Sequence, residues 1–209
     1  MSDMTEVPAA GGLRERKKAR TRAAIRQHAL RLFREQGYDA TTIEQIAAAA
    51  EVSPATFFRY FPTKEDVVLQ DDFDVVTLEA LEAQPPDISP IAAFRGAAAA
   101  ARAQMSADDA AQFAETTRLT LSVPEIRARA LDELVRTTEV ITAAIAARTG
   151  RSPDDFAARN LAGAIIGVIM TATMPWYLHD GGTDVDEMFD RIDAGLAHLE
   201  AGLPLSGPG

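Results

Sequence analysis

One stretch of the chain is suited to binding phosphate. Positions 14 to 34 hold nine basic residues and one acidic residue, a local net charge of +8 in a chain whose total is −10. The first 64 residues sum to +4 and the remainder to −14. A basic segment in an acidic chain is typical of a surface that faces nucleic-acid phosphates. Its basic residues are Arg14, Arg16, Lys17, Lys18, Arg20, Arg22, Arg26, Arg31 and Arg34.

A second segment, residues 41–64, has the pattern of two short helices joined by a tight turn. Ser53 followed by Pro54 is a strong helix-start signal, because serine caps a helix and proline fits its first position. At about 100° per residue, Phe57 and Phe61 share one face, which we expect to be core. The opposite edge would be polar and free to contact a partner: Thr56, Arg59 and Tyr60.

These two segments together predict a helix-turn-helix whose second helix lies in the DNA major groove. An ordinary helical hairpin is the alternative for the Ala-rich pair taken alone. The basic stretch upstream favours the DNA-binding interpretation, since a hairpin inside an enzyme has no need of a cationic helix before it.

The same residues resemble the DNA-binding domain of the TetR (tetracycline-repressor) family of bacterial regulators. The resemblance covers residues 18–78 and fixes apolar, glycine, capping and basic positions together. Phe58 departs from it, standing where the family usually has a tyrosine whose hydroxyl contacts the DNA backbone. The matching positions are Ile25, Ala29, Leu32-Phe33, Gly37-Tyr38, Thr41-Thr42-Ile43, Ile46-Ala47, Val52-Ser53, Thr56-Phe57 and Tyr60-Phe61-Pro62-Thr63-Lys64-Glu65.

The pattern and the resemblance give a set of expected DNA contacts. We expect phosphate contacts from Arg22, Thr41, Thr42, Ser53, Tyr60 and Lys64. We expect base contacts from Pro54, Ala55, Thr56 and Arg59, with Arg59 as the bidentate reader of guanine.

Capping signals and apolar periodicity predict an all-α protein of about nine helices. We expect a disordered tail over residues 1–13, a three-helix DNA-binding domain over 14–63 and a larger helical domain for ligand binding and dimerisation over 64–204. The predicted helices cover 16–36, 43–50, 54–60, 64–83, 90–104, 107–120, 124–148, 153–178 and 184–201.

Residues 161–178 form an uncharged run of eighteen residues that includes Gly163 and Gly167. A transmembrane span is one interpretation; a helix buried between a ligand core and a partner subunit is the simpler one. The last two helices would pair across a two-fold axis, as the resembled family does, although their apolar stripe also suits the core of a single chain. The expected interface residues are Leu161, Ile165, Val185, Phe189, Ile192 and Leu196.

The larger domain supplies rings and methionines that suit an apolar effector pocket, or alternatively a plain core. Arg95, Arg102 and Arg118 would suit an anionic head group, whereas the negative charge of this domain favours a neutral ligand. The resemblance implies that the ligand moves the helix at 64–83 and so releases DNA. The expected pocket residues are Phe73, Phe94, Met105, Phe113, Thr117, Met170, Thr173, Met174, Trp176 and Tyr177.

The sequence offers little for catalysis. It has no cysteine, its three histidines are dispersed, and it shows no nucleophile elbow, phosphate loop or zinc motif. We therefore expect no enzyme activity, no cofactor, no metal and no membrane association. The predicted function is a cytoplasmic homodimeric repressor that a small hydrophobic ligand releases from a palindromic operator. The alternative is an all-α small-molecule-binding or catalytic protein with a structural helix-turn-helix.

Overall fold

The computed structural model describes residues 12–69, 79–180 and 184–204. Within these ranges the chain is helical and contains no strand, which confirms the predicted all-α fold. The chain divides into two compact units, residues 1–68 and 69–209, which we call the head and the body.

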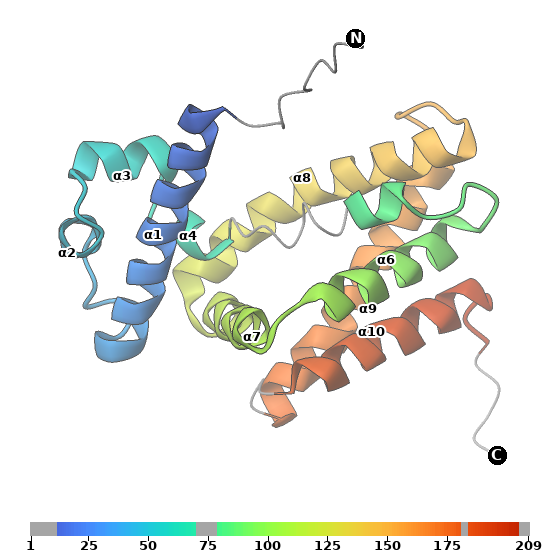
Figure 1. Cartoon of the computed structure of the whole chain (residues 1–209). Coiled ribbons are helices and arrows are strands. Elements are labelled where there is room, and N and C mark those ends of the chain that lie inside the picture. Colours follow the sequence, from blue (N-terminus) through green and yellow to red (C-terminus); the bar gives the residue numbers. More distant parts are fainter. Residues whose placement is uncertain (1–11, 70–78, 181–183, 205–209) are drawn as a thin grey trace, which may run out of the picture. The chain divides into compact units, whose positions relative to one another are not determined.

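From residue 12 on, the head contains three helices and a short fourth one at its end: α1 (Leu13–Gln36), α2 (Ile43–Ala49), α3 (Pro54–Tyr60) and α4 (Asp66–Leu69). The helix α2 packs on both α1 and α3 (Figure 1). One apolar face from each element meets in the interior, so a small unit closes around a core of mainly large side chains. That core contains Ile25, Ala29, Leu30, Phe33, Tyr38, Ile46, Ala47, Phe57, Phe61, Val67 and Val68.

Local capping fixes where α2 and α3 begin. Thr42 and Gln45 form the predicted capping box, in which each side chain accepts a hydrogen bond from the backbone N–H of the other. The Ser53 hydroxyl accepts from the Thr56 N–H at 3.1 Å, with Pro54 at the first helical position. The turn between the two helices holds Glu51 at φ 55°, a left-handed conformation that is uncommon for any residue except glycine.

The head ends at Val68, beyond the predicted boundary after residue 63. Thr63 and Asp66 form a capping box at the start of α4, with N–H to oxygen distances of 3.0 and 3.2 Å. Val67 and Val68 are then completely buried. Because these side chains pack inside the head, the segment 64–68 folds with it.

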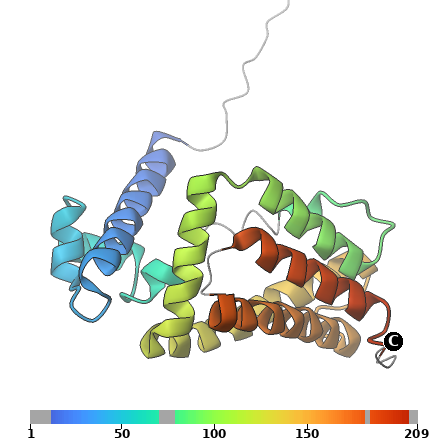
Figure 2. The same ribbon diagram turned by 90° about the horizontal axis from the view of Figure 1, so that it is seen from below.

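The described part of the body contains five long helices: α6 (Pro90–Gln104), α7 (Ala107–Ser122), α8 (Pro124–Thr149), α9 (Phe156–Asp180) and α10 (Val185–Glu200). The helix α10 packs against both α6 and α9, and α8 packs against α7 and α9 (Figures 1 and 2). Of the helix predicted over 64–83, residues 66–69 and 79–82 are helical, and residues 70–78 lie outside the described ranges.

The helix α8 begins at Pro124 as predicted, although its cap Val123 makes no side-chain capping bond. The next predicted start, at residue 153, is wrong. Ser152 begins a turn, and α9 starts at Phe156 after Asp155, whose Oδ1 accepts from the Ala158 N–H at 2.9 Å. The carboxylate supplies the acceptor that free helical N–H groups require.

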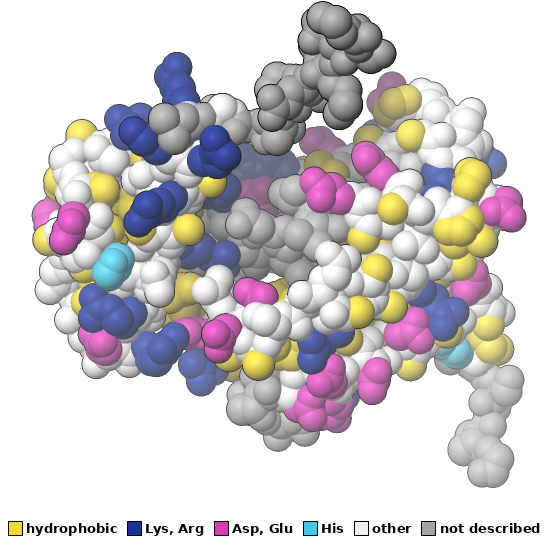
Figure 3. Space-filling model, viewed as in Figure 1, with side chains coloured by type: hydrophobic (Ala, Val, Ile, Leu, Met, Phe, Trp, Pro, Cys, Tyr) yellow, Lys and Arg dark blue, Asp and Glu magenta, His cyan; other side chains and the backbone are white. Residues whose placement is uncertain are grey.

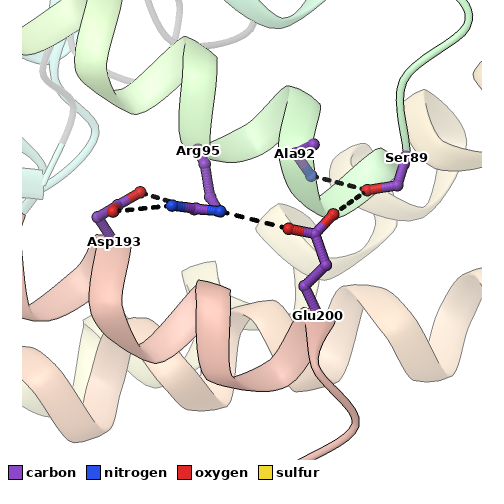
Figure 4. Close-up of polar contacts among 5 residues, drawn as sticks. All are labelled: Ser89, Ala92, Arg95, Asp193 and Glu200. Atoms are coloured by element: carbon purple, nitrogen blue, oxygen red, sulfur yellow. Dashed lines mark hydrogen bonds and ion pairs between the residues drawn. The ribbon is translucent and has the colours of Figure 1, made fainter.

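Ion pairs from two arginines of α6 join it to α10. Arg95 donates to both carboxylate oxygens of Asp193, at 2.7 and 3.0 Å, and to Glu200 at 3.3 Å (Figure 4). Two helical turns away on α6, Arg102 donates to Asp186 at 2.7 Å. Both partners are also seven residues apart, so the pairs form two rungs between antiparallel helices. Pairs spaced in this way favour one register of α10 along α6.

The apolar stripe of α10 and part of α9 is the core of the body. Val185, Phe189, Ile192 and Leu196 are between 2 and 9% exposed, and Ile165 is completely buried, all within one chain. Leu161 is half-buried against the same core. Five of the six predicted interface residues therefore close the interior of the protomer instead of forming an interface, whereas Leu161 is only partly covered. The sequence shows such a stripe but does not show which surface will cover it.

The outer face of α9 remains uncovered. The segment Phe156–Pro175 is long and apolar enough to cross a membrane, yet only 28% of its apolar window is buried. Phe156, Met170 and Met174 are 80, 43 and 37% exposed. A Cβ built on Gly163 or Gly167 would meet no atom within 4 Å. One face of α9 is thus core, and the other carries two open glycines and exposed Phe and Met side chains.

Candidate nucleic-acid interface

The exposed arc of α3 differs from the predicted one. Thr56 and Tyr60, expected on the reading edge, are half-buried, whereas Phe58 and Arg59 are exposed. Pro54 and Ala55 are exposed as expected. Periodicity places Phe58 and Tyr60 equally far from the buried face, and only packing of the rest of the head decides which of them is covered. Sequence reasoning therefore missed Phe58.

Arg59 has the geometry of a base-reading side chain. It is exposed, and its guanidinium lies over the Tyr60 ring with 5.3 Å between its Cζ and the ring centroid. Stacking on an aromatic face orients the planar guanidinium without using its hydrogen-bond donors. This contact therefore leaves the donors available, as bidentate recognition of guanine requires.

The N-terminal part of α1 presents the positive charge. Arg14, Arg16, Lys17, Lys18 and Arg20 are all exposed. Lys and Arg side chains gather over the head on the face shown in Figure 3, whereas the body on that face shows many Asp and Glu side chains. Later basic residues are engaged within the helix, as in the pair from Arg31 to Glu35 at 3.0 Å. The basic surface is thus the first half of α1.

Of the two threonines before α2 that are expected to contact phosphate, Thr42 is exposed and Thr41 is buried. Thr42 is exposed, and its oxygen accepts from the Gln45 N–H, which leaves its hydroxyl proton available. Thr41 is 1% exposed and its hydroxyl donates to the Gly37 carbonyl at 2.7 Å. The predicted phosphate contact of the Thr41 side chain is therefore wrong, because that side chain stabilises the loop before α2.

The Lys64 side chain also forms hydrogen bonds within the head. Its Nζ donates to the carbonyl oxygens of Tyr38 and Thr41 at 2.9 and 3.0 Å and lies 3.8 Å from the centroid of the Tyr38 ring. The Tyr38 hydroxyl in turn donates to Glu65. Two of the three ammonium protons thus join the loop before α2 to the turn after α3. We name this group, Tyr38, Thr41, Lys64 and Glu65, the head clamp.

The head clamp also lowers the pKa of the Glu65 carboxyl. Burial alone would raise the pKa of its carboxyl, but the hydrogen bonds from Tyr38, from its own backbone and from Thr63, with the charge of Lys64, hold that pKa below its ordinary value. The carboxylate stays ionised and keeps accepting from Tyr38.

Arg22 and Ser53 complete the predicted contacts. Arg22 is half-buried, with its guanidinium 5.6 Å from the centroid of the Phe61 ring, so its stem packs on the head core. Ser53 is exposed, and its hydroxyl lies 3.0 Å from that of Thr56. Arg22 thus contacts the residue that ends α3, and Ser53 caps the start of the same helix.

The predicted pocket residues that the structure describes divide between the body core and the exposed face of α9. Phe94 is buried in the body core, with Met105, Phe113 and Tyr177 packed against it. Met170 and Met174 lie on the exposed face of α9, which corrects their placement. Thr117 is half-buried, and the Thr173 hydroxyl donates to the Ile169 carbonyl at 2.8 Å. Phe73 and the side chain of Trp176 lie outside the described part.

The arginines considered for an anionic head group have other roles. Arg95 and Arg102 form the two rungs to α10. The hydrogen bonds that Arg95 donates to Asp193 and Glu200, with the charges of these carboxylates, raise the pKa of Arg95 despite partial burial. Arg118 is exposed on α7.

Both units of the chain match known protein families. Residues 25–70 match the family model "Bacterial regulatory proteins, tetR family", and residues 88–204 match the "MftR C-terminal domain". The chain is 35% identical over 204 residues to the HTH-type transcriptional regulator TcmR of Streptomyces glaucescens, covering 94% of this chain and 90% of that protein. It is 28% identical over 191 residues to the putative mycofactocin biosynthesis transcriptional regulator MftR of Mycobacterium tuberculosis, covering 88 and 95%.

Solved structures share the fold. A putative TetR-family regulator from Syntrophomonas wolfei matches with a TM-score of 0.64 at 20% identity, covering 91% of this chain and all of that one. Thermus thermophilus FadR, a TetR-family repressor in complex with lauroyl-CoA, matches with a TM-score of 0.57 at 23% identity, covering 90 and 99%. The chain therefore belongs to the TetR family of bacterial regulators and is a DNA-binding transcriptional regulator rather than an enzyme.

Proposed function

We propose that the protein is a cytoplasmic homodimeric repressor that binds a palindromic operator and is released from it by a small hydrophobic ligand. The observation that carries the proposal is the exposed Arg59 on α3, stacked on Tyr60, beside an α1 whose first half is basic. Such a surface combines a base-reading group with phosphate-binding charge. A two-fold dimer would present two copies about 34–36 Å apart, one turn of DNA.

The second copy is best accommodated by the outer face of α9. This face is apolar and small, with Gly163 and Gly167 open to close approach and Met170 and Met174 exposed. Exposed apolar faces of this kind mark association surfaces. Glycines four residues apart allow two helix backbones to pack closely, which suits a seam between two copies of α9.

The effector is proposed to be neutral or weakly charged and largely apolar, acyl-chain-like or aromatic. The body interior is formed by Ala, Ile, Phe and Met side chains. Arg95 and Arg102 are already paired to carboxylates, so neither is available to an anionic head without breaking a rung. The lauroyl-CoA of Thermus FadR shows that a protein of this fold holds an acyl chain.

The test begins with selection of duplexes from a random DNA pool by the purified protein. The proposal predicts a palindrome with half-site centres about one turn apart. A thermal-shift screen of fatty-acyl and aromatic compounds then identifies ligands, which are retested for release of the selected duplex. Recovery of no preferred sequence would contradict the regulator assignment, and tight ligands that leave DNA affinity unchanged would contradict the switch.

A further inference from the structure

Phe58 is an aromatic ring on the outside of α3. Half of it (51%) is exposed, and it meets the buried Phe57 edge to face, with ring centroids 5.6 Å apart and planes at 90°. One side of the Phe58 ring is therefore fixed against the core, and the other side faces outward. A large ring in this position contributes little further burial to the head, so its outer surface is available to a partner.

The neighbours of Phe58 make an apolar spot next to the arginine. Pro54 and Ala55 lie four and three residues earlier on α3, and both are exposed. Residues three and four apart are neighbours on a helix surface. We call Pro54, Ala55 and Phe58 the apolar spot of α3. Arg59 is exposed beside it.

The floor of the major groove offers one apolar group, the C5-methyl of thymine; its other base-edge groups are hydrogen-bond donors and acceptors. A phenyl ring carries no donor or acceptor for those groups. We propose that Phe58 contacts a thymine methyl in each half-site and makes the site specific for an A·T pair at that position, beside the base pair that Arg59 reads. The inference rests on the proposed function, because it requires α3 to enter the major groove.

The experiment removes only the methyl group. In a duplex selected by the wild-type protein, each thymine is replaced in turn by uracil, which has the same hydrogen-bonding groups. The expected result is a loss of affinity of about fourfold at one position per half-site, and roughly fifteenfold when both half-sites are changed. Phe58→Ala should bind the thymine duplex more weakly and should no longer distinguish it from the uracil duplex.

Two control variants separate the ring from general loss of binding. Phe58→Tyr keeps an aromatic ring and should retain the preference for thymine. Arg59→Ala should bind the selected duplex more weakly but keep its sensitivity to uracil. Phe58 is exposed, so Phe58→Ala should melt at nearly the wild-type temperature.

The outcomes are distinguishable from failure of the proposed function. If the wild-type protein selects a defined sequence but uracil has no effect at any position, Phe58 lies against the sugar-phosphate backbone and the inference is overturned. If the uracil effect persists in Phe58→Ala, another side chain contacts the methyl, which also overturns it. If no sequence is selected at all, it is the proposed function that fails.

Discussion

At the scale of single residues, local chemistry was predictable and long-range chemistry was not. Thr42 and Ser53 cap their helices as predicted, because a cap depends only on residues within the next turn. Lys64 and Thr41 were assigned to phosphate by their type and place in the family pattern. Their partners in the head clamp depend on contacts between positions 23 and 26 residues apart, which spacing alone does not show.

The head clamp gives a prediction for Lys64→Met. The variant loses two charge-assisted hydrogen bonds, so the head should be destabilised by about 2–3 kcal/mol and bind DNA more weakly. The slope of log Kd against log salt should stay at the wild-type value, because no phosphate contact is lost. The measurement is DNA affinity from 50 to 200 mM salt, at temperatures where the variant is folded.

The matched control is the double variant Lys17→Met/Lys18→Met on the exposed part of α1. Its salt slope should fall by up to about 1.8, or 0.9 for each phosphate released, with little change in melting temperature. A flattened slope in Lys64→Met would instead assign Lys64 to phosphate and contradict the clamp.

At the scale of elements, the helices and most of their boundaries follow from capping and periodicity. The apolar stripe of α10 was visible in the sequence, but its partner was not, since α6 and a second copy of the chain offer similar apolar surfaces. The two rungs between Arg95 and Asp193 and between Arg102 and Asp186 show why α6 is the partner. The matching seven-residue spacing of the arginines on α6 and the aspartates on α10 is recognised only when the two helices are placed side by side.

Close packing of α10 on α9 predicts strain in Gly195→Ala. A Cβ at this position would lie 2.7 Å from Cγ1 of Val168, a side chain that is stiff at χ1. We expect destabilisation by about 1–3 kcal/mol, measured by chemical unfolding. The double variant Gly195→Ala/Val168→Ala should be more stable than the sum of the two single changes implies. Additive effects would mean that the contact is not the cause.

The rung at Asp193 predicts a pH dependence. The hydrogen bond from Arg95 lowers the pKa of Asp193 below its ordinary value, although the carboxyl is about half exposed. A lowered folded-state pKa contributes stability above the unfolded value of about 3.9 and loses it as the pH falls through the folded value. Asp193→Asn should therefore lower the free energy of unfolding by at most about 1 kcal/mol at pH 7. The loss should be smaller near pH 3, where the wild-type carboxylate is partly protonated.

The control for this change is Asp190→Asn, an exposed aspartate on the same helix. Its unfolding free energy should match that of the wild type at both pH values. An equal loss in Asp193→Asn at pH 7 and pH 3 would contradict the contribution of the ion pair.

At the scale of the whole molecule, the division into a basic head and an acidic body was predictable from the change in charge along the chain. The surface of the proposed dimer was not, because burial within one chain and burial against a second copy give the same sequence pattern. The apolar segment of α9 has one face that remains exposed in the protomer.

This face predicts that Met170→Glu converts the dimer to a monomer in sedimentation velocity without lowering the stability of the protomer. Leu131→Glu is the control, since Leu131 is an exposed apolar residue of α8 (57%) and should leave the dimer intact. Phe189→Asp should instead destabilise the body by about 3–5 kcal/mol, because its side chain is core. A dimer that survives Met170→Glu would place the interface elsewhere.

The central claim is that α3 reads DNA sequence, and the most direct test compares wild type and Arg59→Ala on two duplexes. These are the selected operator and a random duplex of the same length, at one salt concentration. Loss of a bidentate guanine contact should weaken operator binding by about 1–3 kcal/mol, roughly 5- to 150-fold, and leave the random duplex unaffected. An equal loss on both duplexes would make Arg59 a phosphate ligand and contradict the account.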